Sequence, residues 1–448
     1  MHASSQRTLD TKPEGVHLRK PTMVVQIDTI SVIPARPLTA YKVAWCIALV
    51  FYFLEYVGRS VPAVMIPELT TAFGVSVIKL SAIIGSYYYT YAVASLLAGA
   101  SLDRYGASAP ISIGASVLGV GCLLFAIPVP WIAESGRLLQ GLGSAFAFTG
   151  AVFLASRGFS GRSLATAVGC TQCVGMLGGS AGQVAVGPLI HGLTDWRGFW
   201  IATAFACLLT AAALRVVAPR KERTTRETGV TGVVAGFKAV FGNPQSYFCG
   251  LVAGLLFTPT TVGAMIWAVA IFQQDRGLLY NQAITTAALV PLGWAIGCPL
   301  LGWVANRLGR RKLVLFAGQA VMLLAILLVA ASTSLAVDYA AMLALGVGSG
   351  AAMIPYTMIK EVNPDRFKGS ATGVMNFLTF TVTAVVGPIF AHLFGASLAS
   401  SSDHAAHFRG ASLFWIAVIV LAIVVSLVLR ETGAARSASR MKPKLNPG

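Results

Sequence analysis

The chain has 448 residues, of which 56% are hydrophobic and only 11% are charged, and its mean hydropathy is +0.74. Soluble globular domains carry about 25% charged residues, so this composition excludes a soluble protein and indicates an integral membrane protein. Long apolar runs without polar alternation predict membrane-spanning helices and exclude a β-barrel. The net charge of +17 does not indicate nucleic-acid binding, because no basic folded domain is present to hold a duplex.

Residues 1–40 contain no apolar run of signal-peptide length, so we expect a disordered cytoplasmic tail and not a cleaved leader. Twelve apolar segments follow, and each is long enough to predict a membrane-spanning helix. They lie at about 43–66, 81–99, 110–131, 137–156, 164–190, 198–218, 247–273, 282–305, 313–334, 336–359, 369–398 and 411–430.

The longest polar interruption separates the sixth span from the seventh, and its charges and glycines indicate a linker. The sequence thus predicts an all-α membrane protein of two six-helix bundles. We expect the N-terminal bundle at 41–218, the cytoplasmic linker at 219–246, the C-terminal bundle at 247–430 and a cytoplasmic tail at 431–448.

The basic residues predict the orientation of these spans. An even number of spans places both termini on one side of the membrane. With the termini in the cytoplasm, most of the 33 Lys and Arg residues lie on the cytoplasmic side, as the positive-inside rule requires. They also edge the anionic leaflet of the bilayer, which accounts for the net positive charge.

The first span carries two opposite charges within an apolar run. Glu55 and Arg59 are four residues apart, a spacing that lets an acid and a base meet on one helix face. A buried arginine costs roughly 2.5–3.5 kcal/mol on insertion scales, so it usually has a function or a partner. For Arg59 we consider substrate contact, a structural ion pair, or snorkelling toward the membrane surface. Glu55 is either a proton-coupling site or simply the partner of Arg59.

Short sequences in the two predicted halves repeat at a nearly constant offset. The segment GASLDRYG at 99–106 corresponds to GWVANRLGRR at 302–311, and GLGS at 141–144 corresponds to GVGS at 346–349. ATAV at 165–168 likewise corresponds to ATGV at 371–374. Four such matches in order, including a looser one after Gly187, predict a duplicated six-helix unit. Repeats of this kind are typical of transporters with a solute site between the halves.

These segments resemble motifs of the major facilitator superfamily of secondary transporters, and the resemblance covers about 41–430. The family pattern Gly-x-x-x-Asp-Arg-x-Gly-Arg-Arg follows span two, where this chain has Ala107 and Ser108 in place of the two last arginines. The resemblance implies the family's twelve-helix fold, alternating access and a cytoplasmic gate at the two loops. The gate residues would be Gly99, Asp103, Arg104, Gly106, Gly302, Asn306, Arg307, Gly309, Arg310 and Arg311.

Span four contains a second family pattern, Arg-x-x-Gln-Gly-x-Gly, which begins at Arg137. In the anion:cation symporter branch, arginines of spans one and four lie near the path of an organic anion. The resemblance therefore implies that Arg59 and Arg137 contact the solute. The chain departs from that branch at Gly58, where an acid is typical. In span five, Gly187 and Pro188 resemble part of an antiporter signature, although helix packing is the better interpretation of the glycines of this span.

Five further residues could line the solute path, although packing or interhelical hydrogen bonding is at least as good an interpretation for each. They are Tyr88, Tyr91, Gln172, Trp267 and Asn376. The seven cysteines lie in apolar runs. Cys170 and Cys173 have CxxC spacing, but no second ligand pair accompanies them, so we predict no metal site. No ATP-binding loop or cofactor motif is evident.

The sequence thus predicts a secondary active transporter of a small solute, in particular an organic anion, coupled to protons. The alternatives are a proton-driven exporter of amphipathic compounds and a non-transporting membrane sensor. We do not expect an enzyme, because no set of nucleophile, base and oxyanion donors is present. The expected partners are the solute, a coupling proton and the lipid bilayer of the cell membrane, with no nucleic acid and no cofactor. We expect a monomer, since this architecture needs no second chain to form a path.

Overall fold

The structure is a computed structural model, and it describes most of the chain between the two tails. The described residues are 38–159, 161–192, 195–220, 230–364, 367–395 and 402–433, without the side chains of Asp103 and of residues 161–165, 191–192 and 230–233. Residues 1–37 of the predicted tail 1–40, residues 434–448 of the predicted tail 431–448 and residues 221–229 of the predicted linker lie outside this description.

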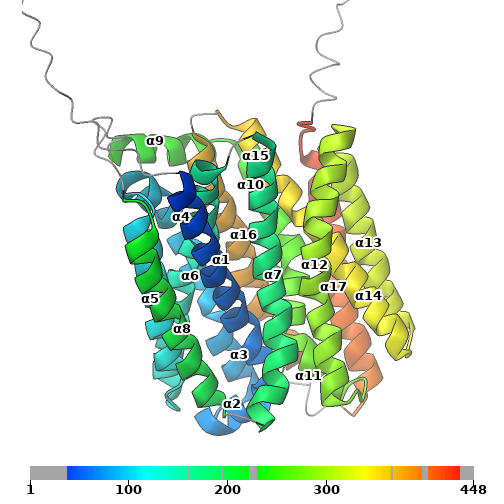
Figure 1. The fold of residues 1–448 in the computed structure, drawn as a ribbon. Helices are drawn as coiled ribbons and strands as arrows, with labels where there is room; N and C mark the ends of the chain where they lie inside the picture. Colours follow the sequence, from blue (N-terminus) through cyan, green and yellow to red (C-terminus); the bar gives the residue numbers. More distant parts are fainter. Residues whose placement is uncertain are drawn as a thin grey trace, which may run out of the picture. The chain divides into compact units, whose positions relative to one another are not determined.

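Helices account for nearly all of the described residues, which contain no β-strand (Figure 1). The first eight α-helices are α1 (Leu38–Ser60), α2 (Ile66–Phe73), α3 (Val77–Gly85), α4 (Tyr87–Tyr105), α5 (Ser108–Phe125), α6 (Pro130–Gly158), α7 (Gly161–Gly192) and α8 (Trp196–Val217). The later ones are α9 (Val230–Phe241), α10 (Pro244–Thr258), α11 (Ala268–Gln274), α12 (Tyr280–Leu308), α13 (Arg311–Ala331), α14 (Leu335–Ser349), α15 (Met353–Val362), α16 (Lys368–Phe390) and α17 (His404–Val428). Short 3-10 or π segments are η1 (Val61–Val64), η2 (Pro259–Trp267), η3 (Gly350–Ala352) and η5 (Ala391–Gly395).

Eleven helical stretches among the described residues are long and apolar enough to cross a membrane. A twelfth span is obtained if α2 and the stretch Val77–Leu102, which meet at a bend of 102°, count as one. This number confirms the predicted fold class. The sequence did not predict α2 as a separate helix, nor α9 inside the region assigned to the linker. Both helices are short, so hydropathy alone does not separate them from loops.

The first residues of α1 and the last residues of α17 lie at the same end of the helical bundle (Figure 1). The assignment of this end to the cytoplasm follows only from the basic residues and stays a prediction. All of the described residues belong to one compact unit, and the proposed boundaries between two bundles stay a prediction as well.

The predicted sequence repeat has matching close contacts in the two halves. A Cβ added to Gly141 would lie 2.1 Å from the Tyr87 carbonyl oxygen, and one added to Gly346 would lie 2.0 Å from that of Val290. Two residues later in each copy, Gly143 would meet Gly114 and Gly348 would meet Gly318 in the same way. The repeated glycines therefore let equivalent helices approach closely, which a larger side chain would prevent.

The seventh span changes its helical type at half its length. It runs over Pro244–Gln274 as α10, η2 and α11, and η2 is a nine-residue π-helix. A π segment shifts the register of the backbone hydrogen bonds and is frequent at functional sites. Two of its carbonyl oxygens accept hydrogen bonds from the N-terminal half. The Tyr88 hydroxyl donates to the Thr261 carbonyl, and the Gln183 side chain donates to the Ala264 carbonyl.

Candidate functional site

Glu55 and Arg59 lie one turn apart on α1, and both are buried, at 0% and 1% exposure. The Arg59 Nη2 group forms an ion pair with Glu55 Oε1, as the spacing predicted. The Tyr87 hydroxyl on α4 completes a triangle, because it accepts from Arg59 Nη2 at 3.0 Å and donates to Glu55 Oε1. Arg59 is thus held inside the protein and does not snorkel to the membrane surface.

The ion pair uses only part of the hydrogen-bonding capacity of its two side chains. Arg59 Nε, Arg59 Nη1 and Glu55 Oε2 are buried and have no hydrogen-bond partner among the described residues. Buried polar atoms are normally paired, and leaving a charged group partly unpaired is costly. These three atoms make the pair a candidate place for a ligand or a proton to bind.

Aromatic rings surround the Arg59 guanidinium. The Arg59 Cζ atom lies 4.5 Å from the ring centre of Tyr56, 4.9 Å from Tyr91 and 5.1 Å from Tyr87. Phe380 on α16 and Tyr88 on α4 follow at 5.3 and 5.9 Å. The faces of these rings attract a cation, so they stabilise the charge without occupying its N–H donors. Because Phe380 comes from the C-terminal half, the site lies between the two halves.

Arg137 on α6 is also buried, but protein atoms already accept its hydrogen bonds. Its Nη1 donates to the Gly58 carbonyl at 3.0 Å and to Gln140 Oε1 at 2.5 Å. Its Nε and Nη2 donate to the Ile84 carbonyl at 3.4 and 3.2 Å. Arg137 therefore ties α6 to α1 and α3. This arrangement favours a structural role over the solute contact that the resemblance implied.

The five additional candidates lie in different surroundings. Tyr88 and Tyr91 pack against Phe380 beside Arg59, with ring centres 6.1 and 4.4 Å from it. Gln172 accepts from the Tyr52 hydroxyl at 3.3 Å, and its buried Nε2 has no partner among the described residues. Asn376 is buried on α16 one turn before Phe380. Trp267, in contrast, packs on Phe390 at the end of α16.

Three residues of α16 belong to this region but were not predicted from the sequence. Phe380 contacts Arg59, and Thr379 and Thr383 lie on the same part of the helix with buried side chains. Threonine and phenylalanine are ordinary residues in an apolar span, so nothing in the sequence distinguishes them. Their spacing from Asn376 was the one available signal. Thr379, Phe380 and Thr383 follow Asn376 by three, four and seven positions, and residues so spaced share a helix face.

The predicted gate loops are held by different contacts. Gly106 and Gly309 end α4 and α12 with positive φ angles of 76° and 62°, which glycine adopts without strain. A Cβ added to Gly99 would lie 3.9 Å from the Gly369 carbonyl oxygen on α16, an ordinary contact between the two helices. The side chain of Asp103 lies outside the described residues.

In the second loop, Arg311 donates to Asn306 Oδ1 at 2.6 Å and to Glu361 Oε1 at 3.0 Å, at the end of α15. Glu431 accepts from the backbone N–H groups of Arg311 and Lys312 at 2.7 and 3.0 Å and so caps the start of α13. Burial raises the pKa of Glu431, but these and neighbouring N–H donors outweigh it and hold the pKa below its ordinary value. The loop is thus bonded to other segments of the C-terminal half.

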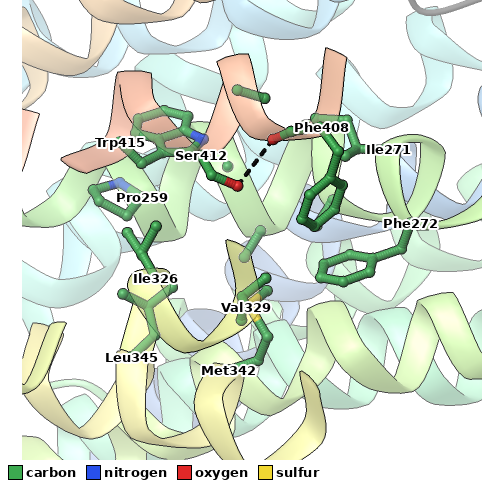
Figure 2. Close-up of a pocket in the computed structure, with 14 residues that line it drawn as sticks. Pro259, Ile271, Phe272, Ile326, Val329, Met342, Leu345, Phe408, Ser412 and Trp415 are labelled. Carbon is green, nitrogen blue, oxygen red and sulfur yellow. Dashed lines mark hydrogen bonds between the residues drawn. The ribbon is translucent and has the colours of Figure 1, made fainter. Parts of the chain in front are cut away.

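An apolar cavity of about 70 Å³ lies elsewhere, among η2, α11, α13, α14 and α17 (Figure 2). Ser412 is the polar side chain in its wall, and its hydroxyl donates to the Phe408 carbonyl at 2.9 Å. The Trp415 indole N–H is the other polar group in the wall, so this cavity offers mainly packing space and little recognition chemistry.

The family is established by comparison with known sequences. A family model described as the Major Facilitator Superfamily matches residues 48–388. The chain belongs to this superfamily. Its apolar helices and its family make it an integral, multi-pass membrane transporter of some solute.

Two curated relatives are also transporters by name. The putative transporter YoaB of Bacillus subtilis (strain 168) is 24% identical over 344 residues, which cover 72% of this chain and 80% of that protein. The probable inositol transporter 2 of Arabidopsis thaliana is 31% identical over 150 residues, which cover 32% of this chain and only 25% of that protein.

Solved structures agree in fold. A bacterial homologue of the human lysosomal transporter Spinster, in an inward-facing and unoccupied conformation, superposes with a TM-score of 0.69. The match covers 88% of this chain and 97% of that one at 14% sequence identity. The occupied form of a bacterial Spinster homologue gives a TM-score of 0.65. At such identity the likeness shows the fold alone.

Proposed function

We propose that this transporter moves a small organic anion across the cell membrane by alternating access and couples the movement to protons. The observation that carries the proposal is the buried Arg59, whose Nε and Nη1 donors have no partner in the described part of the chain. A carboxylate fits such donors well, since arginine binds planar anions through two N–H groups. The surrounding aromatic rings exclude water and strengthen that interaction.

The geometry of the guanidinium links anion binding to Glu55. Arg59 Nε and Nη1 do not share an edge of the group, so a carboxylate that accepts two hydrogen bonds must use Nη2 together with one of them. Nη2 is the atom that now pairs with Glu55. An incoming anion therefore competes with Glu55 for Arg59.

A carboxylate that loses its cation in apolar surroundings is stabilised by taking up a proton. Glu55 Oε2 is free to receive that proton, and the Tyr87 hydroxyl next to Oε1 is positioned to remain bonded. Anion binding and proton binding then favour each other, which is the property that a symporter needs. In this proposal the two gate loops break and reform as the halves rock.

Export of amphipathic compounds has less support. Gly187, the glycine of the partial antiporter signature, lies against α12, because a Cβ there would be 2.7 Å from Ile284 Cδ1. This contact is explained by helix packing. A buried arginine with free donors also disfavours the cationic compounds that such exporters often carry.

Counterflow in proteoliposomes tests the proposal. Vesicles loaded with unlabelled monocarboxylates, sugar acids, inositol or cationic dyes are supplied with the labelled form of the same compound. We expect exchange of organic anions and no exchange of cations. Exchange of cations or of neutral inositol without any response to anions would overturn the organic-anion proposal.

Glu55→Gln tests the coupling step separately. This variant keeps a hydrogen bond acceptor next to Arg59 but cannot exchange a proton. We expect it to retain counterflow and to lose accumulation driven by an imposed pH gradient. Glu134→Gln is the matched control, because Glu134 lies near the start of α6 and is not among the described partners of Arg59. It should leave both activities intact. A Glu55→Gln protein that still accumulates anion with the pH gradient contradicts the assignment of Glu55.

A further inference from the structure

A cavity of about 120 Å³ lies between the two halves, next to the Arg59 site. Its walls come from α3 and the start of α4 on one side and from η2, α16 and η5 on the other. Tyr88 belongs to both places, because it lines the cavity and its ring faces Arg59. The cavity therefore borders the Arg59 site, and Tyr88 is the residue that the two places share.

Two threonine hydroxyls of α16 are unpaired at this place. Thr383 lines the cavity and is 1% exposed, and Thr379 lies one turn before it at 0% exposure. Neither Oγ1 atom has a hydrogen bond of normal geometry within the described residues. The Tyr356 side chain interacts with the Thr379 hydroxyl, so Thr383 is the hydroxyl that mainly carries the argument. Both side chains are buried on the face of α16 that also carries Phe380.

Other threonines of the same helix show what a purely structural threonine does. Thr372 and Thr381 donate to the carbonyl oxygens of Lys368 and Phe377, at 2.9 and 2.7 Å, in the usual bond to the preceding turn. Thr379 and Thr383 have the same local option and do not use it. A valine would fill the same space without an unpaired hydroxyl, so two unpaired hydroxyls need another explanation.

We propose that Thr383 and Thr379 form a subsite that binds hydroxyl groups of the solute, and that the solute is a hydroxylated carboxylate such as a sugar acid. The inference rests on the proposed binding of a carboxylate at Arg59. Phe380 contacts Arg59, and Thr383 follows it by three residues, or roughly 4.5 Å along the helix axis. A short chain bound by its carboxylate at Arg59 places its hydroxyl carbons beside these threonines.

The chemistry of the cavity agrees with a polar but uncharged part of the solute. A threonine hydroxyl both donates and accepts, which matches an alcohol and does not require a charge. Tyr88 and Trp267 supply apolar faces for the carbon chain. A site built to bond hydroxyl groups also rejects an analogue that lacks them, since its own polar groups then stay unpaired.

Matched pairs of anions test the subsite by competition in counterflow. Gluconate is compared with hexanoate, and glycerate with propionate, because each pair differs mainly in hydroxyl groups. We expect the wild-type protein to be inhibited more strongly by the hydroxylated member. Thr383→Val should raise the half-inhibitory concentration of the hydroxylated member about tenfold and leave that of the other unchanged.

Variants of the same helix separate recognition from folding. Thr383→Ser keeps the hydroxyl and should restore the preference, and Thr379→Val should reduce it. Thr381→Val is the matched control, because its hydroxyl is bonded to Phe377 and its position, two residues from both Thr379 and Thr383, lies on the opposite side of the helix. The melting temperature of each purified variant shows whether it is folded.

The outcomes distinguish this inference from the proposed function. Transport of both members of a pair without preference, or an equal effect of Thr383→Val on both, would overturn the subsite and leave the anion proposal standing. If neither member of either pair competes, the anion proposal fails and the subsite fails with it.

Discussion

Arg59 on α1 and Arg137 on α6 are both buried arginines of the N-terminal half, yet their guanidinium groups are bonded in opposite ways. Arg137 donates through all three of its nitrogens to Gly58, Ile84 and Gln140. Arg59 donates only through Nη2, and two of its nitrogens are unpaired among the described residues. Burial alone does not distinguish the two residues, but hydrogen-bond satisfaction does.

The difference separates a residue that holds helices together from one whose donors are available for the anion of the proposed function. Around Arg137 the helices are also in close contact, since a Cβ on Gly141 would lie 2.1 Å from the Tyr87 carbonyl oxygen. Gln140 extends the network to the Gly121 carbonyl at 3.2 Å. The Arg-x-x-Gln-Gly pattern of span four is therefore explained by packing. The aromatic surroundings of Arg59 instead stabilise its charge and leave its N–H groups available.

Substitution of Arg59 should have the largest effect on transport. We expect Arg59→Met to reduce anion uptake at least about 100-fold, as is typical when one partner of a buried charged contact is removed. The fold should persist, because Arg59 forms few bonds to other helices. Uptake and melting temperature are measured on the same preparation. The double variant Arg59→Met with Glu55→Gln leaves no unpaired buried charge. If this double variant is folded and still lacks uptake, misfolding does not explain the loss.

Substitution of Arg137 should lower the stability of the protein and leave its affinity for the solute unchanged. Arg137→Met leaves the carbonyl oxygens of Gly58 and Ile84 without their donor, so we expect a loss of stability of about 3 kcal/mol. The folded fraction should keep the KM of the wild type. Thermal unfolding and uptake kinetics check these two expectations, and Gly141→Ala should destabilise similarly by overpacking α4. A stable Arg137→Met protein with a much higher KM would show that Arg137 contacts the solute after all.

Much of the fold was predictable because long apolar runs have one stable solution in a bilayer. The chain must form helices that satisfy their own backbone groups, so hydropathy gave the number of spans and their approximate limits. The bend of 102° between α2 and the following span and the π-helix η2 were not predicted. They depend on how neighbouring helices receive the freed backbone groups, and hydropathy does not contain that information.

The site was predictable only where local geometry decides it. The pairing of Glu55 with Arg59 follows from a spacing of four residues on one helix. Besides Gln140 of its own motif, the acceptors of Arg137 are backbone carbonyls of α1 and α3, which any sequence could supply, so the motif did not reveal its full role. Thr379 and Thr383 became informative only when the structure showed which threonines of α16 are bonded to their own helix.

Tyr87→Phe should give the smallest change and tests the link between Arg59 and Glu55. The substitution keeps the ring near the guanidinium but removes the hydroxyl that bonds to both charged groups. One hydrogen bond contributes about 1 kcal/mol net, so we expect a change in KM of roughly fivefold. The pH dependence of uptake should change more clearly, because Glu55 loses a donor that stabilises its charged form. Tyr91→Phe is the control, since its ring lies 4.9 Å from Arg59 Cζ and no bond from its hydroxyl to either charge occurs in the described structure. If both variants behave alike, the aromatic rings and not the hydroxyl of Tyr87 determine how Arg59 and Glu55 respond to the solute.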